Sequence, residues 1–220
     1  MRTPSPGPRQ QGPRRRDSKP GQFRPLGLDK RGLLAGIVAG LIVIVAIVAV
    51  VVARGSGSGS GNSKSSTTAI AALSAAGCGY HRYPSEGRAH VSSLAAKVNY
   101  HTFPPTSGTH YYIPAVWNRY TQPLVLVQEV HNLEHGGVII QYGDKVPQAT
   151  VAKLASFYDS SPNAMLLAPL PKLGNKIALT AWTRLALCTQ YNQAAFAGFR
   201  DAFRGQGPEK FPVSSLTPGS

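Results

Sequence analysis

An uninterrupted apolar run near the N-terminus constrains this chain more than any other feature of its sequence. Residues 33–53 contain twenty-one consecutive side chains without a charged or polar group. As a helix, such a run spans about 30 Å, the thickness of the hydrocarbon core of a bilayer. Lys30, Arg31 and Arg54 flank the run, which is longer than the apolar part of a cleaved signal peptide. The sequence therefore predicts one uncleaved transmembrane helix over residues 32–54.

The residues before this run are strongly basic. Residues 1–31 contain nine Lys or Arg and two Asp, so they carry +7 of the formal net charge of +14. They are rich in proline and poor in apolar side chains, which predicts a disordered tail. A basic tail is also typical of nucleic-acid binding. Beside a membrane helix, however, we interpret it as a topology signal that faces the lipid bilayer, and we expect no nucleic-acid partner. The positive-inside rule then places the N-terminus in the cytoplasm and the rest of the chain outside it, at the cell membrane.

The remaining segments follow from composition. Gly36 and Gly40 form a GxxxG motif, and such spacing lets two membrane helices approach closely. We therefore expect that the chain can form a homodimer through this face of the predicted membrane helix. Residues 55–68 are rich in Gly and Ser, which predicts a flexible linker. We expect an extracytoplasmic domain over residues 69–212 and a flexible tail over residues 213–220.

Two cysteines, Cys78 and Cys188, lie near opposite ends of the expected domain. In an oxidising compartment an isolated pair of cysteines is usually bridged, so the sequence favours a disulfide between them. Two buried free thiols are the alternative.

The hydrophobic pattern predicts an α+β domain, with a small, mostly antiparallel sheet, two flanking helices and long N-terminal loops. Glycines and prolines punctuate residues 77–115, which are predicted to be loops. The first two predicted strands are separated by a few residues only, so we expect them to form an antiparallel hairpin. The predicted strands cover residues 124–130, 137–142, 165–167 and 177–182, and the predicted helices cover residues 146–158 and 191–203.

All six histidines lie between residues 81 and 135, and His131, Glu134 and His135 match HxxEH, the inverted signature of zinc metalloproteases. Residues four apart share one face of a helix, but on a strand they lie about 13 Å apart, too far to share a metal ion. Because strands are predicted on both sides of the motif, a catalytic helix is not expected there. Joint coordination would require a tight turn, and the protease interpretation is not favoured.

Three motifs make the chain similar to a known family. They are His101-x-x-Pro104-Pro105-Thr-Ser-Gly108-Thr-His110-Tyr111, Val130-His131-Asn-Leu-Glu134-His135-Gly136, and the pair Ala181-Trp182 with the later Gly207-Pro208-Glu209. With these motifs the chain resembles domain-of-unknown-function family 3105, membrane-tethered extracytoplasmic proteins that are frequent in actinobacteria. The resemblance covers about residues 78–211 and implies a prokaryotic cell-envelope setting. It implies no reaction. Met165 falls where this family tends to have methionine.

The candidate site residues are His101, His110, His131, Glu134 and His135. The Pro104–Gly108 turn is suited to bringing His101 and His110 together. Neutral imidazoles, with the Met165 thioether as a further candidate, favour copper or zinc. The alternative is a hydrogen-bonded polar cluster that holds the loops in place. His81 and His90 are predicted to be solvated loop residues.

Two functions from different classes remain open. The first is a metal-binding extracytoplasmic module, and the second is a non-catalytic envelope scaffold or accessory subunit of a membrane complex. The sequence contains no nucleophile elbow, phosphate-binding loop or dinucleotide fingerprint, so it assigns no enzymatic reaction.

Overall fold

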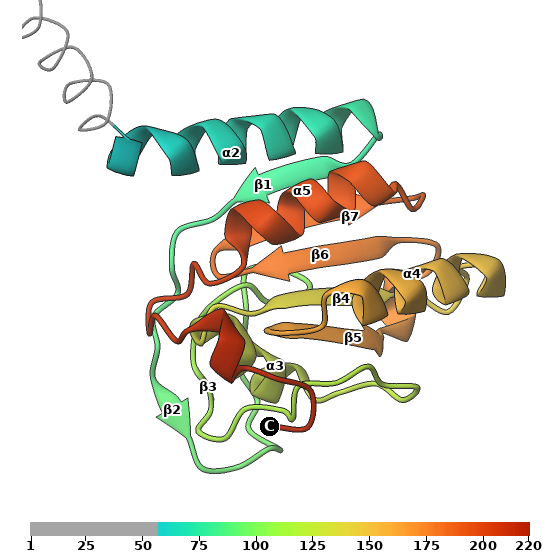
Figure 1. Ribbon diagram of the computed structural model, residues 1–220. Coiled ribbons are helices and arrows are strands. Elements are labelled where there is room, and N and C mark those ends of the chain that lie inside the picture. Colours follow the sequence, from blue (N-terminus) through green and yellow to red (C-terminus); the bar gives the residue numbers. More distant parts are fainter. Residues whose placement is uncertain (1–56) are drawn as a thin grey trace, which may run out of the picture. The chain divides into compact units, whose positions relative to one another are not determined.

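A five-stranded sheet forms the centre of the domain (Figure 1). The computed structural model describes residues 57–220. The predicted tail (1–31), the predicted membrane helix (32–54) and the Gly36–Gly40 association face lie outside the described residues. Within the described part of the chain, no helix combines the length and apolar character needed to cross a membrane. The helices are α2 (Gly57–Ala75), α3 (Leu126–Glu134), α4 (Gln148–Ser160) and α5 (Gln193–Phe203), with 3-10 turns η1 (Pro171–Leu173) and η2 (Val213–Ser215).

The main sheet has the strand order β1-β7-β6-β4-β5. Its neighbouring strands are antiparallel except for β4 and β5, which are parallel. Helix α4 connects β4 to β5, and a crossover of this kind is what a parallel pair requires. The predicted class, α+β with a mostly antiparallel sheet, is therefore confirmed. The strands are β1 (Gly79–Arg82), β4 (Val138–Tyr142), β5 (Met165–Pro169), β6 (Ile177–Ala181) and β7 (Arg184–Cys188).

Both faces of this sheet are buried over β4, β5 and β6, whose successive side chains point to opposite faces. Val138 and Ile140 of β4 pack in a core with side chains of α2, α4 and α5. Ile139, which lies between them, packs in a second core with Leu133 of α3 and Trp117. The described domain thus has four helices distributed over both faces of the sheet, whereas the sequence predicts two.

The prediction of a strand over residues 124–130, and of a hairpin with residues 137–142, is wrong. Most of that segment belongs to α3, and β4 pairs instead with β5 and β6. Val127, Val130 and Leu133 are all buried, and their three-residue spacing aligns them along one side of a helix. The β-branched residues favour a strand locally, but burial against the sheet decides for a helix.

The disulfide between Cys78 and Cys188 is confirmed. Cys78 directly precedes β1 and Cys188 ends β7, so the bridge joins two strands that also pair with each other. Both strands lie outside the predicted elements.

The two ends of the described domain also differ from the sequence predictions. Residues 57–68 were expected in the flexible linker but form the first part of α2, whose later residues Ala69 and Leu73 are buried in the core. Residues 213–220 were expected as a flexible tail, but they pack against the domain. Leu216 is buried there, and the backbone N–H of Trp117 donates to the carbonyl of Ser220.

Candidate metal centre

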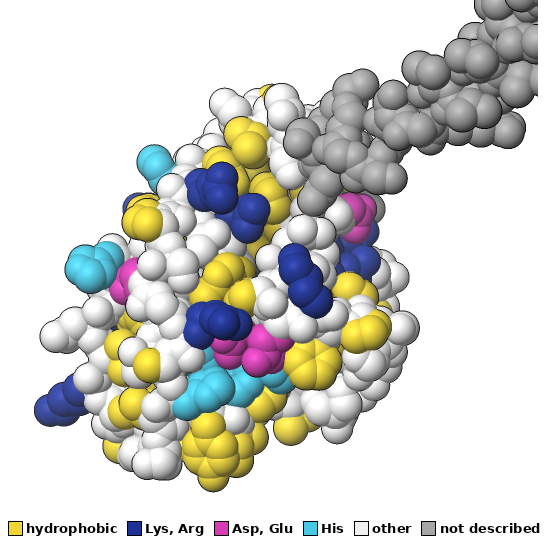
Figure 2. All heavy atoms as spheres, turned by 90° about the vertical axis from the view of Figure 1, so that its left-hand side faces the viewer, with side chains coloured by type: hydrophobic (Ala, Val, Ile, Leu, Met, Phe, Trp, Pro, Cys, Tyr) yellow, Lys and Arg dark blue, Asp and Glu magenta, His cyan; other side chains and the backbone are white. Residues whose placement is uncertain are grey.

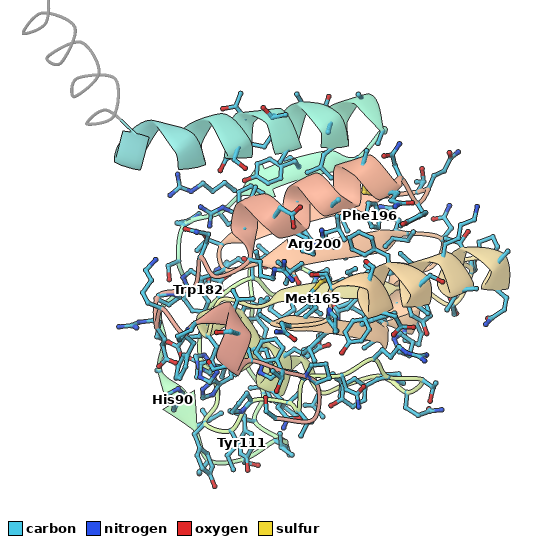
Figure 3. All side chains as sticks on the ribbon, in the orientation of Figure 1. His90, Tyr111, Met165, Trp182, Phe196 and Arg200 are labelled. Carbon is cyan, nitrogen blue, oxygen red and sulfur yellow. A yellow bond between two sulfur atoms is a disulfide. The ribbon has the colours of Figure 1, made fainter. Side chains whose placement is uncertain are left out.

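Three elements bring the central histidines together. A short parallel pair of strands, β2 (His90–Val91) and β3 (His110–Tyr111), places His90 directly opposite His110. Helix α3 carries His131. The centroid of the His131 ring lies 4.9 Å from that of His110 and 5.1 Å from that of His90. Figure 3 shows His90 and Tyr111 at the same end of the domain.

The HxxEH motif lies at the end of α3, with Glu134 as its last helical residue and His135 as its C-cap. One helical turn therefore separates His131 from His135, and their Nε2 atoms are 3.0 Å apart. The expectation that strands lie on both sides of this motif is wrong, because α3 precedes it. The helix, without a tight turn, already brings the two imidazoles close enough to share a metal ion.

Backbone carbonyl groups orient two of the rings. His110 Nδ1 lies 2.7 Å from the carbonyl oxygen of Gly108, and His131 Nδ1 lies 2.8 Å from that of Tyr111. A carbonyl oxygen only accepts, so Nδ1–H donates in both cases. The neutral forms of both rings then carry the lone pair on Nε2, which faces the other cluster residues. Such a bond from the second ring nitrogen is characteristic of metal-ligating histidines.

Glu134 connects these rings through one of its carboxylate oxygens. Glu134 Oε2 is 2.9 Å from His110 Nε2 and 3.5 Å from His90 Nε2. Its other oxygen, Oε1, is 3.7 Å from Arg88 Nε. The carboxylate is almost completely buried, so its charge is only weakly screened by water. We call His90, His110, His131 and Glu134 the inner set; their potential ligand atoms all lie within 4.8 Å of one another.

A second group shares His131 with the first. Glu209 Oε2 is 2.9 Å from His135 Nε2, which in turn contacts His131 Nε2. We call His131, His135 and Glu209 the outer set, and their potential ligand atoms also lie within 4.8 Å of one another. Figure 2 shows histidine side chains gathered beside acidic and basic side chains on this face of the domain.

Close backbone contact positions Glu209 beside the helix. Gly205 N–H donates to the carbonyl of Gly136 at 2.7 Å, and Glu209 N–H donates to the carbonyl of Glu134 at 3.3 Å. A Cβ atom on Gly207 would collide with the carbonyl oxygen of Glu134 and with the backbone of Gly136. Only glycine therefore allows this segment to lie against the end of α3.

We expect Gly207→Ala to destabilise the domain by about 1–3 kcal/mol, because the added methyl group meets backbone atoms that cannot rotate away. Thermal unfolding of the variant measures this loss. Gly79→Ala is the matched control, since the nearest atom to its added Cβ is 4.0 Å away. Equal melting temperatures for the two variants would contradict the assigned role of Gly207.

Burial keeps the histidines of the helix neutral. Desolvation lowers the pKa of His135 to about 4, and the neighbouring His131 contributes in the same direction. Desolvation also lowers the pKa of His131, opposed by its bond to the Tyr111 carbonyl. Neutral imidazole is the form that binds a metal ion.

The structure places four predicted site residues in the cluster: His110, His131, Glu134 and His135. His101 is not among them. Its side chain is 87% exposed, and Nδ1 contacts Glu86 Oε2 at 3.1 Å. The turn that was expected to bring it to His110 is buried at Thr106 and Ser107, while His101 points outward from the start of this segment.

Met165 is also placed elsewhere. It lies in β5, fully buried, and its side chain belongs to the core shared with α4 and α5. In Figure 3 it lies among the strands, apart from His90.

Sequence reasoning missed two residues of the cluster, His90 and Glu209. His90 was predicted to be solvated, and its side chain is 45% exposed, but its ring stacks on that of His131 at an interplanar angle of 11°. Glu209 belongs to the late Gly207-Pro208-Glu209 motif, which carries part of the family resemblance. That motif was the available signal for it.

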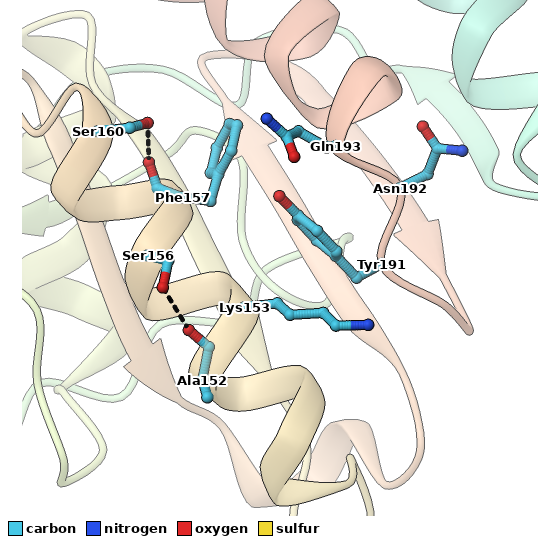
Figure 4. Close-up of a pocket in the computed structure, with 8 residues that line it drawn as sticks. All are labelled: Ala152, Lys153, Ser156, Phe157, Ser160, Tyr191, Asn192 and Gln193. Atoms are coloured by element: carbon cyan, nitrogen blue, oxygen red, sulfur yellow. Dashed lines mark hydrogen bonds between the residues drawn. The ribbon is translucent and has the colours of Figure 1, made fainter.

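A groove of about 630 Å³ lies between α4 and the start of α5 (Figure 4). Lys153 is the charged residue in its lining. Ser156 and Ser160 already donate to carbonyl groups of their own helix. Among the described residues, both groups of potential metal-ligand atoms lie at the histidine cluster and not in this groove, so the cluster is the better candidate site.

Comparison with known proteins adds one match. A protein-family model described as a protein of unknown function (DUF3105) matches residues 90–214. The match includes every residue of the inner and outer sets. No curated protein and no solved structure matches the chain.

Proposed function

Because the chain belongs to the DUF3105 family, whose function is unknown, we propose a function from the geometry of its own residues: it binds one transition-metal ion, zinc or copper(II), through the inner set. The observation that carries the proposal is the convergence of three imidazoles and one carboxylate, with all potential ligand atoms within 4.8 Å of one another.

The spacing of these atoms supports the proposal. Two ligand atoms that bind one zinc ion at about 2.0–2.1 Å, with ordinary angles between them, are about 2.9–3.4 Å apart. Glu134 Oε2 is 2.9 Å from His110 Nε2 and 3.5 Å from His90 Nε2. The other ligand atoms of the inner set are within 4.8 Å of one another, so side-chain movements of about 1–2 Å bring them to the same spacing.

Orientation of the rings supports it further. His110 donates its Nδ1–H to the Gly108 carbonyl, so in the neutral ring Nε2 carries a lone pair that faces the Glu134 carboxylate. Two acceptors in contact at 2.9 Å require a cation between them, either a proton or a metal ion. With both atoms buried, a metal ion also neutralises the carboxylate in a place that water reaches poorly.

The set of ligand atoms favours zinc or copper(II) over copper(I). Among the described residues, the inner and outer sets offer nitrogen and oxygen only. Both cysteine sulfurs form the disulfide, and the Met165 thioether lies in the hydrophobic core. Imidazole suits zinc and copper(II), whereas copper(I) is favoured by thiolate and thioether ligands.

The HxxEH motif does not extend the proposal to peptide hydrolysis. In the metalloprotease mechanism the Glu is free to act as a general base towards a metal-bound water. Here Glu134 Oε2 contacts His110 Nε2, and Oε1 faces Arg88. This arrangement supports a ligand role for Glu134.

Zinc titration of the purified chain tests the proposal. We expect one zinc ion per chain for the wild type and an affinity at least about 100-fold lower for His110→Ala, because a buried ligand is lost. His101→Ala is the matched control, since His101 is exposed and outside both sets. Substoichiometric zinc and copper in the wild type, unchanged by His110→Ala, would refute metal binding. These residues would then serve as a hydrogen-bonded polar cluster that holds the loops in place.

We also propose that the site lies outside the cytoplasm, on a membrane-anchored chain. The Cys78–Cys188 disulfide supports this location, because disulfides persist in oxidising compartments. A protease added to intact cells should digest the domain and leave the N-terminal segment protected. A fully protected domain would contradict the proposed topology.

A further inference from the structure

We propose that the outer set is a second position for the same metal ion, through which the ion enters and leaves the inner set. This inference rests on the proposed function, since it describes how the inner site is loaded. It assigns roles to His135 and Glu209, which the inner set does not use.

The geometry of the outer set suits one metal ion. His135 Nε2 is 3.0 Å from His131 Nε2 and 2.9 Å from Glu209 Oε2. These separations match those of two ligand atoms on one ion, about 2.9–3.4 Å. The close backbone contact between Gly207 and the end of α3 holds Glu209 in this place.

The two positions exclude each other because both need the same atom. His131 Nδ1 is bonded to the Tyr111 carbonyl, so Nε2 is the ring atom that remains for a metal ion. One imidazole nitrogen has one lone pair and holds one ion. The chain therefore binds a single ion at a time, in one position or the other.

Exposure and ligand number assign the direction of exchange. The inner set has four ligand groups, three of them buried, whereas the outer set has three, of which only His131 is buried. Fewer and more exposed ligands bind an ion more weakly and release it faster. The outer position is therefore the one that exchanges ions with an external chelating carrier, and the inner position is the one that retains them.

The positively charged Arg88 side chain lies beside the exposed member of the inner set. His90 is the exposed member of that set, and it faces the same carboxylate as Arg88. The Arg88 side chain is 54% exposed, so its positive charge lies at this opening and repels an incoming metal ion.

Transfer between the positions needs only ligand exchange. The ion stays bound to His131 Nε2 while His135 and Glu209 are replaced by the remaining inner ligands. Nothing is oxidised or reduced. Because all the atoms of each set lie within 4.8 Å of one another, the ion moves a few ångströms at most.

Glu209→Gln tests this route in the full chain, with zinc and a chromophoric chelator as the probe. We expect the equilibrium affinity to change less than about 3-fold, while the rates of zinc loading and of extraction by the chelator both fall about 10-fold or more. Asp201→Asn is the matched control for loss of an exposed carboxylate, because Asp201 pairs with Arg200 and belongs to neither set. Unchanged rates, or two zinc ions per wild-type chain, would overturn the inference.

A second measurement isolates the outer position. In His110→Ala, zinc binding should persist weakly, and adding Glu209→Gln should abolish it. Equal residual binding with and without Glu209 contradicts the outer position. A wild type that binds no metal refutes the proposed function itself, whereas one ion per chain with unaltered exchange in Glu209→Gln refutes only the entry route.

Discussion

Replacing Cys78 and Cys188 together by alanine is expected to lower the free energy of unfolding of the domain by about 4–5 kcal/mol. The disulfide joins residues separated by 110 positions in the sequence, so the loop that it closes contains all five strands of the main sheet together with α3 and α4. In the chain-entropy account, such a loop removes many conformations of the unfolded chain and thereby stabilises the folded state. Alanine avoids placing hydroxyl groups at two buried positions. Urea unfolding of the wild type and the double variant measures the difference.

Reductant provides the control for this prediction. It should lower the stability of the wild type to that of the double variant, and it should leave the double variant unchanged. Because β1 and β7 also pair through their backbones, the reduced domain is expected to keep the same sheet. A difference below about 1 kcal/mol would show that the unfolded chain is already compact without the bridge.

Glu129→Gln is expected to stabilise the domain by a few kcal/mol above about pH 8, and to have almost no effect near pH 4. Glu129 lies on α3, almost completely buried, and accepts hydrogen bonds from the Gln141 side-chain amide at 2.9 and 3.1 Å. Desolvation raises the pKa of its carboxyl group from 4.5 to about 8, and the bond from Gln141 lowers it only in part. Within residues 65–220, no Lys or Arg forms an ion pair with it.

The direction of the pH dependence follows from this raised pKa. The folded domain holds the Glu129 proton more tightly than the unfolded chain does. The resulting stability is fully present below pH 4.5 and is lost as the pH rises through about 8. The variant has no titrating group at this position and does not suffer that loss.

Urea unfolding at several pH values, with a chelator present to remove bound metal, measures the difference between wild type and variant. The other titrating groups are common to both proteins, so their contributions cancel. Gln141→Leu is a companion variant: without the amide, the wild-type carboxylate loses its hydrogen bonds, and the domain should be less stable at high pH in particular. A constant difference between Glu129→Gln and the wild type at all pH values would mean that folding does not shift the pKa of Glu129.

The local sequence pattern was sufficient for the elements in the second half of the domain. Helices α4 and α5 and strands β4, β5 and β6 overlap their predicted ranges. Each has a clear period of apolar residues, such as the buried Phe196, Phe199 and Phe203 on α5. The local pattern does not reveal α3, because Val125, Val127 and Val130 favour a strand over a short range. Strands β1 and β7 were missed because their backbone pairing joins distant parts of the chain.

Only part of the cluster was predicted, because short-range sequence patterns do not show which distant residues meet. His131, Glu134 and His135 are adjacent in the sequence, so their motif was visible without a fold. The closeness of His101 to the Pro104–Gly108 turn favours it as a member of the cluster, but in the structure its side chain points outward and contacts Glu86. His90 and Glu209 reach the cluster through the β2–β3 pair and through the glycine contacts after α5, which no short-range pattern reveals.

The sequence by itself determined the class of the domain, the pairing expected for its two cysteines and the concentration of its histidines within residues 81–135. These properties depend on composition and on short-range periodicity, which are written in the chain directly. Only the tertiary structure decided that the HxxEH motif ends a helix and that His90 and Glu209 complete two overlapping ligand sets. The physical reason is that convergence of side chains depends on strand register, on helix packing against the sheet and on close backbone contacts. All of these join residues that are far apart in the sequence.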